Sequence, residues 1–477
     1  MNVVPRIATL QEYYAVPAVR ARMLEYCGGV DGGPPTCLFV SGLSARDRPV
    51  ITWGRAPLSP VSELDALCCD DADVARSLWD SSSLLIHLDL DYQNTDSPGE
   101  AYHHPAEVFH KLEPVYRAVR HVLGRFEMPL LTLMTGRGYH FTGRVPLDAG
   151  VIDRLAGLVP EPPAWLATLP ARRPPWVASD ITERHAKAYI GAGLLVEWFA
   201  HLILRRARRR SPIPIVLNGT VVGSGPTGRE CASLDLSYAG DPMDVRHLRV
   251  AFSAYQKHRL RPDLVGHGAA SARAPFIAVP RGHESLEHLL SLGRTYSHAA
   301  RAARGHSAVI PVVAAGVHRA LNAYGRSRLS AFHRCFYGAP PHRRPEDGAR
   351  ILASLRDLPA CASRPLELPN DRLLQPAFTQ HVTRVLMADG LPPRDIAALV
   401  HGRYVADFGW GRRWAWLDPE TRAEFDVRVF AGLVATGLDQ ALDFNCTSAQ
   451  EKGLCPGEVC THDLRVDRAR LLEAGPT

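Results

Sequence analysis

Two aspartates stand one residue apart at the end of an apolar run, LLIHLDLDYQN, over residues 84–94. The run follows a polar break, and its composition predicts a buried strand. Side chains alternate across a strand, so Asp89 and Asp91 should share one face. Neighbouring carboxylates raise the cost of ionising each other, and a divalent cation such as Mg²⁺ would relieve that cost. Asp-x-Asp also occurs in glycosyltransferases and in surface turns, so the pair alone does not define a site.

A glycine-rich turn in LMTGRGYHFTGRV is the second feature that suggests chemistry. It carries Thr135, Gly136, Arg137 and Gly138, and His140 opens the strand that follows. The two glycines allow a tight turn and the close approach of a ligand. Arg137 and His140 beside exposed amide groups would suit a phosphate. The alternative is a tight hairpin whose histidine packs into the core.

A third carboxylate, Asp235, lies in a short apolar strand predicted within ECASLDLSYAG. Together with the first pair it would complete a site for two cations, although aspartates at strand ends are common. The stretch RHLRVAFSAYQKHRL follows closely and predicts a cationic loop or short helix. Its candidate binding residues are Arg249, Ser253, Lys257 and His258. The alternative for this stretch is a solvated basic face.

The elements around these residues predict an α+β fold. Apolar residues at helical spacing over 105–126 lie between the strand at 84–94 and predicted strands at 130–134 and 139–145. This order indicates a sheet with helices on one side. Further expectations are strands at 37–42, 50–54, 213–219 and 231–238, an irregular proline-rich crossing at 160–176, a helix at 186–209 and helices over 285–335.

The chain divides into three predicted parts. Residues 1–285 would form a catalytic domain, residues 286–345 a helical linker region, and residues 346–477 a helical C-terminal domain. The stretch PHRRPEDG marks the boundary before the last part. Helices are predicted there within FTQHVTRVLMAD, RDIAALVHGRY and EFDVRVFAGLVATGLDQAL.

The bulk properties are those of a globular protein. The chain has 477 residues and a formal net charge of +6, which an acidic partner would tolerate. No apolar run approaches the roughly 18 to 20 residues of a membrane span, and the N-terminus has no signal-peptide layout. We therefore expect a cytoplasmic protein without a membrane partner. Its ten cysteines should not form disulfides.

Cys446, Cys455 and Cys460 lie close together in a polar, Gly/Pro-rich segment, and Cys361 stands upstream. Four thiolates could hold Zn²⁺ or an iron–sulfur cluster, although the paired C-x₂-C of a zinc ribbon is missing. The alternative is a set of unrelated thiols. The other cysteines are interpreted as structural: Cys27, Cys37, Cys68, Cys69, Cys231 and Cys335.

The order Asp-x-Asp, Gly-rich turn ending in histidine, then lone aspartate resembles the three catalytic motifs of the archaeo-eukaryotic primase superfamily. The stretch LRVAFSAYQKHRL resembles the arginine–serine–lysine stretch that follows the third motif. The resemblance covers roughly residues 80–260 and implies an RRM-like catalytic core. It implies that Asp89, Asp91 and Asp235 bind two Mg²⁺ or Mn²⁺ ions. The implied nucleotide-binding residues are Thr135, Gly136, Arg137, Gly138, His140, Arg249, Ser253, Lys257 and His258.

The region at about 350–465 resembles the C-terminal domain of the large subunit of these primases. That domain holds a 4Fe-4S cluster through one cysteine before its helices and three after them. The resemblance implies that Cys361, Cys446, Cys455 and Cys460 bind the cluster, with Zn²⁺ as the alternative. Cys460 follows Cys455 without the long insertion of many relatives. One chain would then fuse a catalytic module with an initiation module.

The implied partners are a single-stranded DNA template and nucleoside triphosphates, with a helicase or replicative polymerase as a further expectation. Candidate contacts to nucleic acid are RRARRR at 205–210 and the set Trp410, Arg412, Arg413, Trp414 and Trp416. Three alternatives stay open. They are a polymerase that extends but does not initiate, a non-catalytic nucleic-acid-binding protein, and a metal-dependent glycosyltransferase, which explains neither the turn nor the cysteines. The absence of an N-terminal zinc ribbon argues against a bacterial-type primase.

Overall fold

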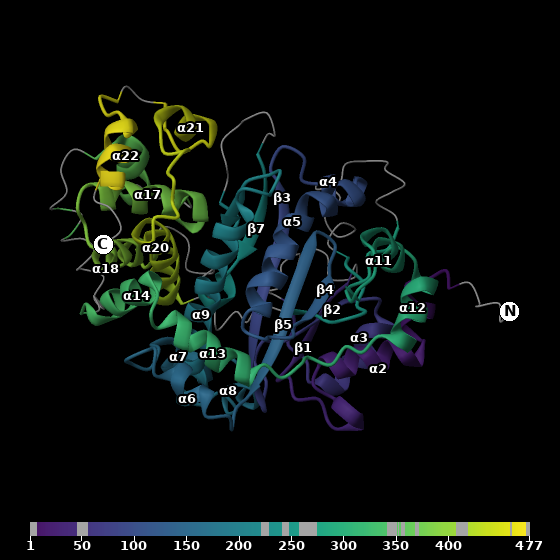
Figure 1. Ribbon diagram of the computed structural model, residues 1–477. Helices are drawn as coiled ribbons and strands as arrows, with labels where there is room; N and C mark the ends of the chain where they lie inside the picture. The colour runs from purple at the N-terminus through teal and green to yellow at the C-terminus, as the bar shows by residue number, and fades with distance from the viewer. Residues whose placement is uncertain are drawn as a thin grey trace.

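The computed structural model describes residues 7–44, 56–220, 229–240, 248–256, 274–340, 351, 353, 358–367, 372–406, 418–457 and 460–473. The protein is α+β, with 53% helix and 14% strand. A mixed six-stranded sheet forms its centre, and helices form its C-terminal region (Figure 1). The predicted α+β class is confirmed.

The six-stranded sheet has the order β6-β7-β3-β5-β4-β9. Its strands are β3 (Ser83–Asn94), β4 (Leu131–Met134), β5 (Gly138–Pro146), β6 (Ile215–Leu217), β7 (Glu230–Asp235) and β9 (Val279–Pro280). β3 is antiparallel to both of its neighbours, β5 and β7, and β6 is parallel to β7. The predicted strands at 84–94, 130–134, 139–145 and 213–219 are confirmed. The one at 231–238 ends at Asp235, and a 3₁₀ turn, η5 (Ser237–Gly240), follows.

Four of these strands and two helices follow one another as β3, α5 (Pro105–Gly124), β4, β5, α9 (Glu183–Ala207) and β7. This βαββαβ path has the spatial strand order β7-β3-β5-β4, in which the fourth strand lies beside the first. It is the ferredoxin-like split βαβ arrangement. Between β5 and α9 the chain forms three shorter helices.

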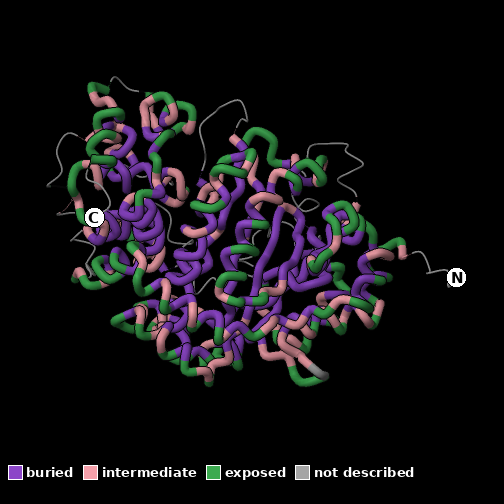
Figure 2. Tube along the Cα trace, viewed as in Figure 1, coloured by how far each residue is buried: buried purple, intermediate pink, exposed green. Residues whose placement is uncertain are grey.

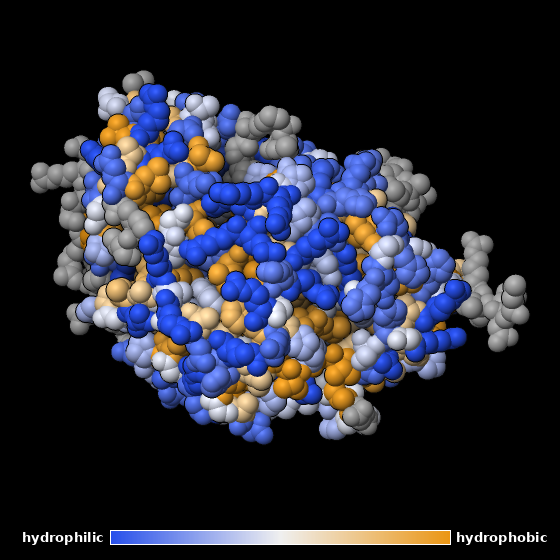
Figure 3. All heavy atoms as spheres, viewed as in Figure 1, coloured by the Kyte–Doolittle hydropathy of each residue, from blue (hydrophilic) through white to orange (hydrophobic). Residues whose placement is uncertain are grey.

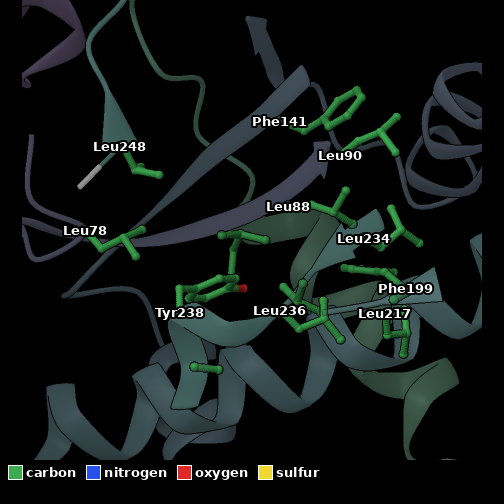
Figure 4. Packing of buried hydrophobic residues seen from close by; sticks show 14 of the residues in the cluster. Leu78, Leu88, Leu90, Phe141, Phe199, Leu217, Leu234, Leu236, Tyr238 and Leu248 are labelled. Carbon is green, nitrogen blue, oxygen red and sulfur yellow. The ribbon is translucent and has the colours of Figure 1, made fainter. Parts of the chain in front are cut away.

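Helices α5 and α9 pack against each other and against the sheet (Figure 1). Tyr139 and Phe141 of β5 contact the ring of Tyr116 on α5. Figure 4 shows Leu90 of β3 gathered with Phe199 of α9 in the same buried cluster. The even-numbered positions of β3 therefore point toward the helices, as period-two alternation requires.

α9 corrects the expectation that no segment is apolar enough to span a membrane. By length and composition the helix meets that test, but 83% of its most apolar window is buried inside the protein. Figure 2 shows α9 as a mostly buried central element. A core helix of a globular protein has these properties as well, so the helix is weak evidence for a membrane location.

The predicted irregular crossing at 160–176 is wrong. After α6 (Val151–Ala156), the chain forms α7 (Trp165–Arg172) within this range and begins α8 (Pro175–Ala178). A proline-rich composition does not exclude helix here, because Pro175 occupies the first turn of α8, where its missing N–H costs nothing. Trp165 and Val177 of these helices are fully buried, and this packing offsets the cost of Pro170 inside α7.

A smaller antiparallel sheet joins β1 (Val40–Leu43), β2 (Asp73–Arg76) and β8 (Leu248–Arg249). The predicted strand at 37–42 overlaps β1, and the one at 50–54 lies outside the described residues. The N-terminal helices are α1 (Leu10–Tyr14), η1 (Val30–Gly32), η4 (Val61–Glu63), α2 (Pro17–Tyr26), α3 (Leu64–Cys69) and, after β3, α4 (Glu100–His103).

The rest of the described chain is helical, as predicted for 285–335 and for the C-terminal part. The helices are α11 (Leu286–Gly293), α12 (Tyr296–Gly305), α13 (Ala314–Tyr324), α14 (Arg328–Gly338), α16 (Ala360–Glu367), η8 (Arg372–Leu374), α17 (Pro376–Ala388), α18 (Pro393–Tyr404), α20 (Pro419–Ala435), α21 (Cys446–Glu451) and α22 (Leu464–Glu473). α20 ends at Ala435, whereas the stretch predicted to be helical continues to Leu442. The helix ends early because the chain turns at Gly437, whose φ is positive. The predicted boundary PHRRPEDG lies outside the described residues.

Candidate active site

The pairing of three strands brings the predicted carboxylates and histidine together. Asp89 on β3 lies opposite His140 on β5 and opposite Asp235 on β7. Asp91 lies opposite Gly138 and Ser233 in the same two pairings. Residues paired directly across antiparallel strands have Cβ atoms about 4.5–5.5 Å apart. Three motifs that are distant in the chain therefore meet on three adjacent strands.

These side chains occupy the face of the sheet that α5 and α9 leave uncovered. Tyr139 and Phe141 contact α5, so His140 between them points the other way. The side chains of Asp89, Asp91 and His140 keep 15%, 17% and 11% of their surface exposed. These side chains are thus mostly buried, and each keeps a small exposed part that a ligand can contact.

Asp89 and Asp235 present like charges on directly paired positions, an arrangement that destabilises a sheet. Asp235 is fixed by Ser237, which donates from its backbone nitrogen at 2.9 Å and from its hydroxyl at 2.7 Å to Oδ1. His140 Nε2 lies 3.7 Å from Asp89 Oδ1. Sequence reasoning missed Ser237, although Asp-x-Ser is a common local hydrogen-bonding pattern.

The Gly-rich turn holds Arg137 against Asp91. Arg137 Nη2 donates to Asp91 Oδ2 at 2.5 Å, and this carboxylate raises the pKa of the guanidinium well above its usual value. The Arg137 carbonyl accepts from Tyr92 N at 2.9 Å, and Thr135 N donates to the Gly138 carbonyl at 2.8 Å. Arg137 Nε is buried with no hydrogen-bond partner among the described residues, so the guanidinium retains a donor for a ligand.

Close packing explains both glycines of the turn. A Cβ on Gly138 would lie 1.8 Å from the Leu90 carbonyl oxygen, and one on Gly136 would lie 2.9 Å from the Tyr255 ring. Tyr255 packs with Tyr102 and Phe276 in a small buried cluster, and the two tyrosine hydroxyls are hydrogen-bonded at 2.8 Å. No pattern in the sequence indicated that this aromatic cluster would pack against the turn.

The stretch after Asp235, predicted as a cationic loop or short helix, is buried over its described residues 248–256, and the nucleotide-binding roles of Arg249 and Ser253 stay predictions. Arg249 lies in β8, is buried, and binds both oxygens of Asp73 at 2.8 Å. Ser253 is fully buried, and its hydroxyl accepts from Val74 N at 2.7 Å. The apolar stretch between them pulls the segment into the core, and Asp73 compensates the arginine. Arg249 still lies 4.1 Å over the ring of Tyr255, behind the turn.

Several predicted contacts lie outside the described residues: Lys257, His258, Trp410, Arg412, Arg413, Trp414 and Trp416. The structure instead adds His87, which sequence reasoning missed. Its ring lies 5.2 Å from that of His140, edge to face, and its Nδ1 is 3.0 Å from the hydroxyl of Thr142. Its position two residues before Asp89 on the same strand face was the available signal.

The donor set suits a hard divalent cation, because carboxylate oxygens from adjacent strands converge. In the part of the chain that the structure describes, however, no three His, Cys, Asp or Glu side chains are grouped closely enough to hold a metal. The Asp91 carboxylate is turned to Arg137 instead. A carboxylate has two oxygens, so Asp91 can reach a cation either through Oδ1, with Oδ2 still paired to Arg137, or by leaving that ion pair.

The four C-terminal cysteines share one neighbourhood. Burial raises the pKa of the Cys361 thiol to about 12, with further contributions from Cys455, Cys460 and Cys446. Cys361 begins the helical region on α16, and His381 Nε2 on α17 lies 3.1 Å from its Sγ. The thiols are therefore near one another in space, although they do not form a closed metal site among the described residues.

All ten cysteines are free thiols, which confirms that no disulfide forms. Of those interpreted as structural, four are buried and two, Cys69 and Cys335, are exposed. The exposed pair has no packing role that the structure shows.

The chain matches no protein-family model, no curated protein and no solved structure. The resemblance to primases therefore rests on the sequence motifs alone.

Proposed function

We propose that the protein is a DNA-dependent primase that synthesises primers de novo on single-stranded DNA from nucleoside triphosphates. The observation that carries this proposal is the strand register that sets Asp89 between His140 and Asp235. Three motifs resembling those of the archaeo-eukaryotic primases thereby converge on one open sheet face. The βαββαβ path, with its fourth strand beside its first, also supports an RRM-like catalytic core.

In this proposal Asp89, Asp91 and Asp235 hold Mg²⁺ or Mn²⁺. Two such ions, when bound, activate the attacking hydroxyl and neutralise the charge on the leaving pyrophosphate. Arg137 and His140 bind the phosphates of the incoming nucleotide. When a phosphate takes over the Arg137 guanidinium, Asp91 loses its partner and becomes available to the site.

The helical C-terminal region is proposed to be a large-subunit-like initiation module. Cys361, Cys446, Cys455 and Cys460 would hold a 4Fe-4S cluster, with Zn²⁺ as the alternative. Cys455, Cys460 and Cys446 all influence the Cys361 thiol, and this proximity of thiols from both ends of the region supports a common ligand. The proposal places the protein in the cytoplasm, with a helicase or replicative polymerase as its further partner.

Two other functions use the same site or the same surface. A primer-extending polymerase needs the three aspartates but not initiation. A non-catalytic nucleic-acid-binding protein needs neither the three aspartates nor initiation. In such a protein the repulsion between Asp89 and Asp235 would lower stability without a functional benefit. The paired carboxylates therefore favour an enzyme.

The experiment supplies single-stranded DNA, labelled nucleotides and Mn²⁺ or Mg²⁺ to the full chain, with and without a primer. New oligonucleotides without a primer support the primase. Products only with a primer would establish the extending polymerase instead. No product in either reaction would contradict nucleotide joining and leave the binding protein.

A further inference from the structure

The C-terminal end of α9 forms a basic strip together with the outer face of α5. The two helices lie antiparallel, because Phe126, just after α5, contacts Trp198 in the middle of α9. Arg210 and Arg206, past the end and in the last turn of α9, therefore come to lie along α5. They line a hollow of about 390 Å³ together with His110, Glu113, Pro114, Arg117 and Ala118. We call Arg117, Arg125, Arg206 and Arg210 the basic strip.

His121, further along α5, shows which arginines of the strip lie near one another. The pKa of His121 is lowered by desolvation and by the positive charges of Arg206, Arg125 and Arg210. These three arginines thus surround one exposed position on α5. Figure 3 shows hydrophilic side chains on this face over α5 and α9, with hydrophobic ones between them.

Negative charge does not balance the strip. Glu113, the carboxylate of the hollow, is engaged by Arg281 at 2.9 and 3.1 Å and by Arg117 at 3.1 Å. Arg125, Arg206 and Arg210 form no ion pair among the described residues. The helix dipole accounts for Arg206 in the last turn of α9. It does not account for Arg117 or Arg210, which lie outside a last helical turn.

The strip has the dimensions and chemistry of a phosphodiester contact. Arg117 on α5 and Arg125 at its C-cap are eight residues apart, or about 12 Å along the helix axis, so the strip is long enough to contact more than one phosphate of a strand. Arginine binds phosphate through paired N–H donors. A protein partner would need an apolar centre to its docking surface, yet α5 and α9 contribute no exposed large apolar side chain among the described residues.

We propose that the basic strip binds the backbone of a nucleic-acid strand, on the face of the sheet opposite the carboxylates. This is a second contact, separate from the floor that carries Asp89, and it is independent of sequence because it reads phosphates alone. It holds a strand at the back of the sheet while the open face is free for chemistry. The inference does not require the proposed activity.

The test measures binding of a fluorescein-labelled single-stranded oligonucleotide of mixed sequence by anisotropy over a range of salt concentrations. The Arg206→Glu/Arg210→Glu variant of the full chain should bind at least about tenfold more weakly. The slope of log affinity against log salt should fall by about 1.4, or about 0.7 for each lost phosphate contact. Arg301→Glu/Arg304→Glu on α12 is the matched control, since both arginines are exposed and the charge change is the same. It should change affinity less than twofold.

Equal affinity and slope in the strip variant and the α12 control would overturn the proposal. So would tighter binding of a poly-glutamate peptide than of the oligonucleotide, because that result assigns the strip to an acidic protein. If the Glu variant unfolds, Arg206→Gln/Arg210→Gln repeats the test without charge reversal.

Discussion

Asp89 and Asp235 illustrate a conflict between stability and function at the scale of single residues. Their carboxylates are paired across β3 and β7, where like charges cost the folded state about 0.2–1 kcal/mol. Ser237 fixes one of them by two hydrogen bonds instead of neutralising it. A chain that keeps this arrangement gains something other than stability from it, and cation binding is the simplest gain.

Asp89→Asn and Asp235→Asn should lower nucleotide joining at least about 100-fold, because each removes a charged ligand of the cations. The same changes should leave the free energy of unfolding equal or raise it by about 0.2–1 kcal/mol, since they remove repulsion. Activity assays and urea denaturation measure the two effects. Asp148→Asn, at an exposed position with no ion pair among the described residues, is the control and should change neither. A fully active Asp89 variant would refute the metal site.

Cys455→Ser should strip bound iron or zinc and reduce initiation more than extension of a supplied primer, because the thiols are proposed to serve the initiation module. Metal analysis and the two activity assays measure this. Cys335→Ser is the control, since that free thiol is exposed. Equal loss of initiation and extension would reduce the cysteines to a structural role.

At the scale of elements, the close contact of β3 and β5 depends on Gly138. A Cβ there would meet the Leu90 carbonyl oxygen at 1.8 Å, which the backbone can accommodate only by moving. Gly138→Ala should therefore cost about 1–3 kcal/mol of unfolding free energy. Because it displaces the turn that carries Arg137, it should also lower activity about 100-fold.

Denaturation midpoints and initial rates test the glycine prediction. Gly150→Ala provides the comparison, since a Cβ at Gly150 meets nothing within 4 Å. If both variants are equally stable and active, the register of β3 and β5 does not depend on this contact.

The sequence predicted helices and strands better than it predicted which of them lie side by side in the fold. The strand at 84–94 and the helix at 105–126 follow from local periodicity, which a sequence displays directly. The meeting of Asp89 with Asp235 depends on strand order, which no local pattern contains. Arg249 was misplaced for the same reason, because its partner Asp73 lies 176 residues earlier. The helices within 160–176 were missed because Pro175 occupies the first turn of a helix and because the burial of Trp165 offsets the cost of Pro170 inside α7.

At the scale of the whole molecule, a buried charge network joins α9 to the helical C-terminal region. Glu197 on α9 lies 3.0 Å from Arg428 on α20 and 3.2 Å from His333 on α14. Arg428 also donates to the Tyr337 hydroxyl at 2.7 Å. Burial alone would raise the pKa of Glu197, but Arg428 and His333 hold it at about 2. This buried ionic contact thus links α9, which packs on the sheet, to the helical region.

Glu197→Gln should destabilise the protein by about 3–5 kcal/mol, because it leaves Arg428 buried without its carboxylate. The pKa of Glu197 is depressed in the folded state, so its stabilisation is complete above about 4.5 and is lost as the pH falls toward 2. Wild-type stability should therefore fall over this range more steeply than that of the variant. Urea denaturation at several pH values measures both. Glu127→Gln, with a side chain 79% exposed, should behave as wild type. Parallel pH curves for wild type and Glu197→Gln would contradict this role.

The central claim is that the open sheet face joins nucleotides on a template, and one measurement tests it most directly. Wild-type protein and Asp89→Asn are each given homopolymer single-stranded DNA templates, Mn²⁺ and one labelled nucleotide at a time. The account predicts that wild type incorporates only the complementary nucleotide on each template and that Asp89→Asn incorporates none above background. Incorporation that ignores the template, that is equal in the two proteins, or that is absent from wild type would contradict it.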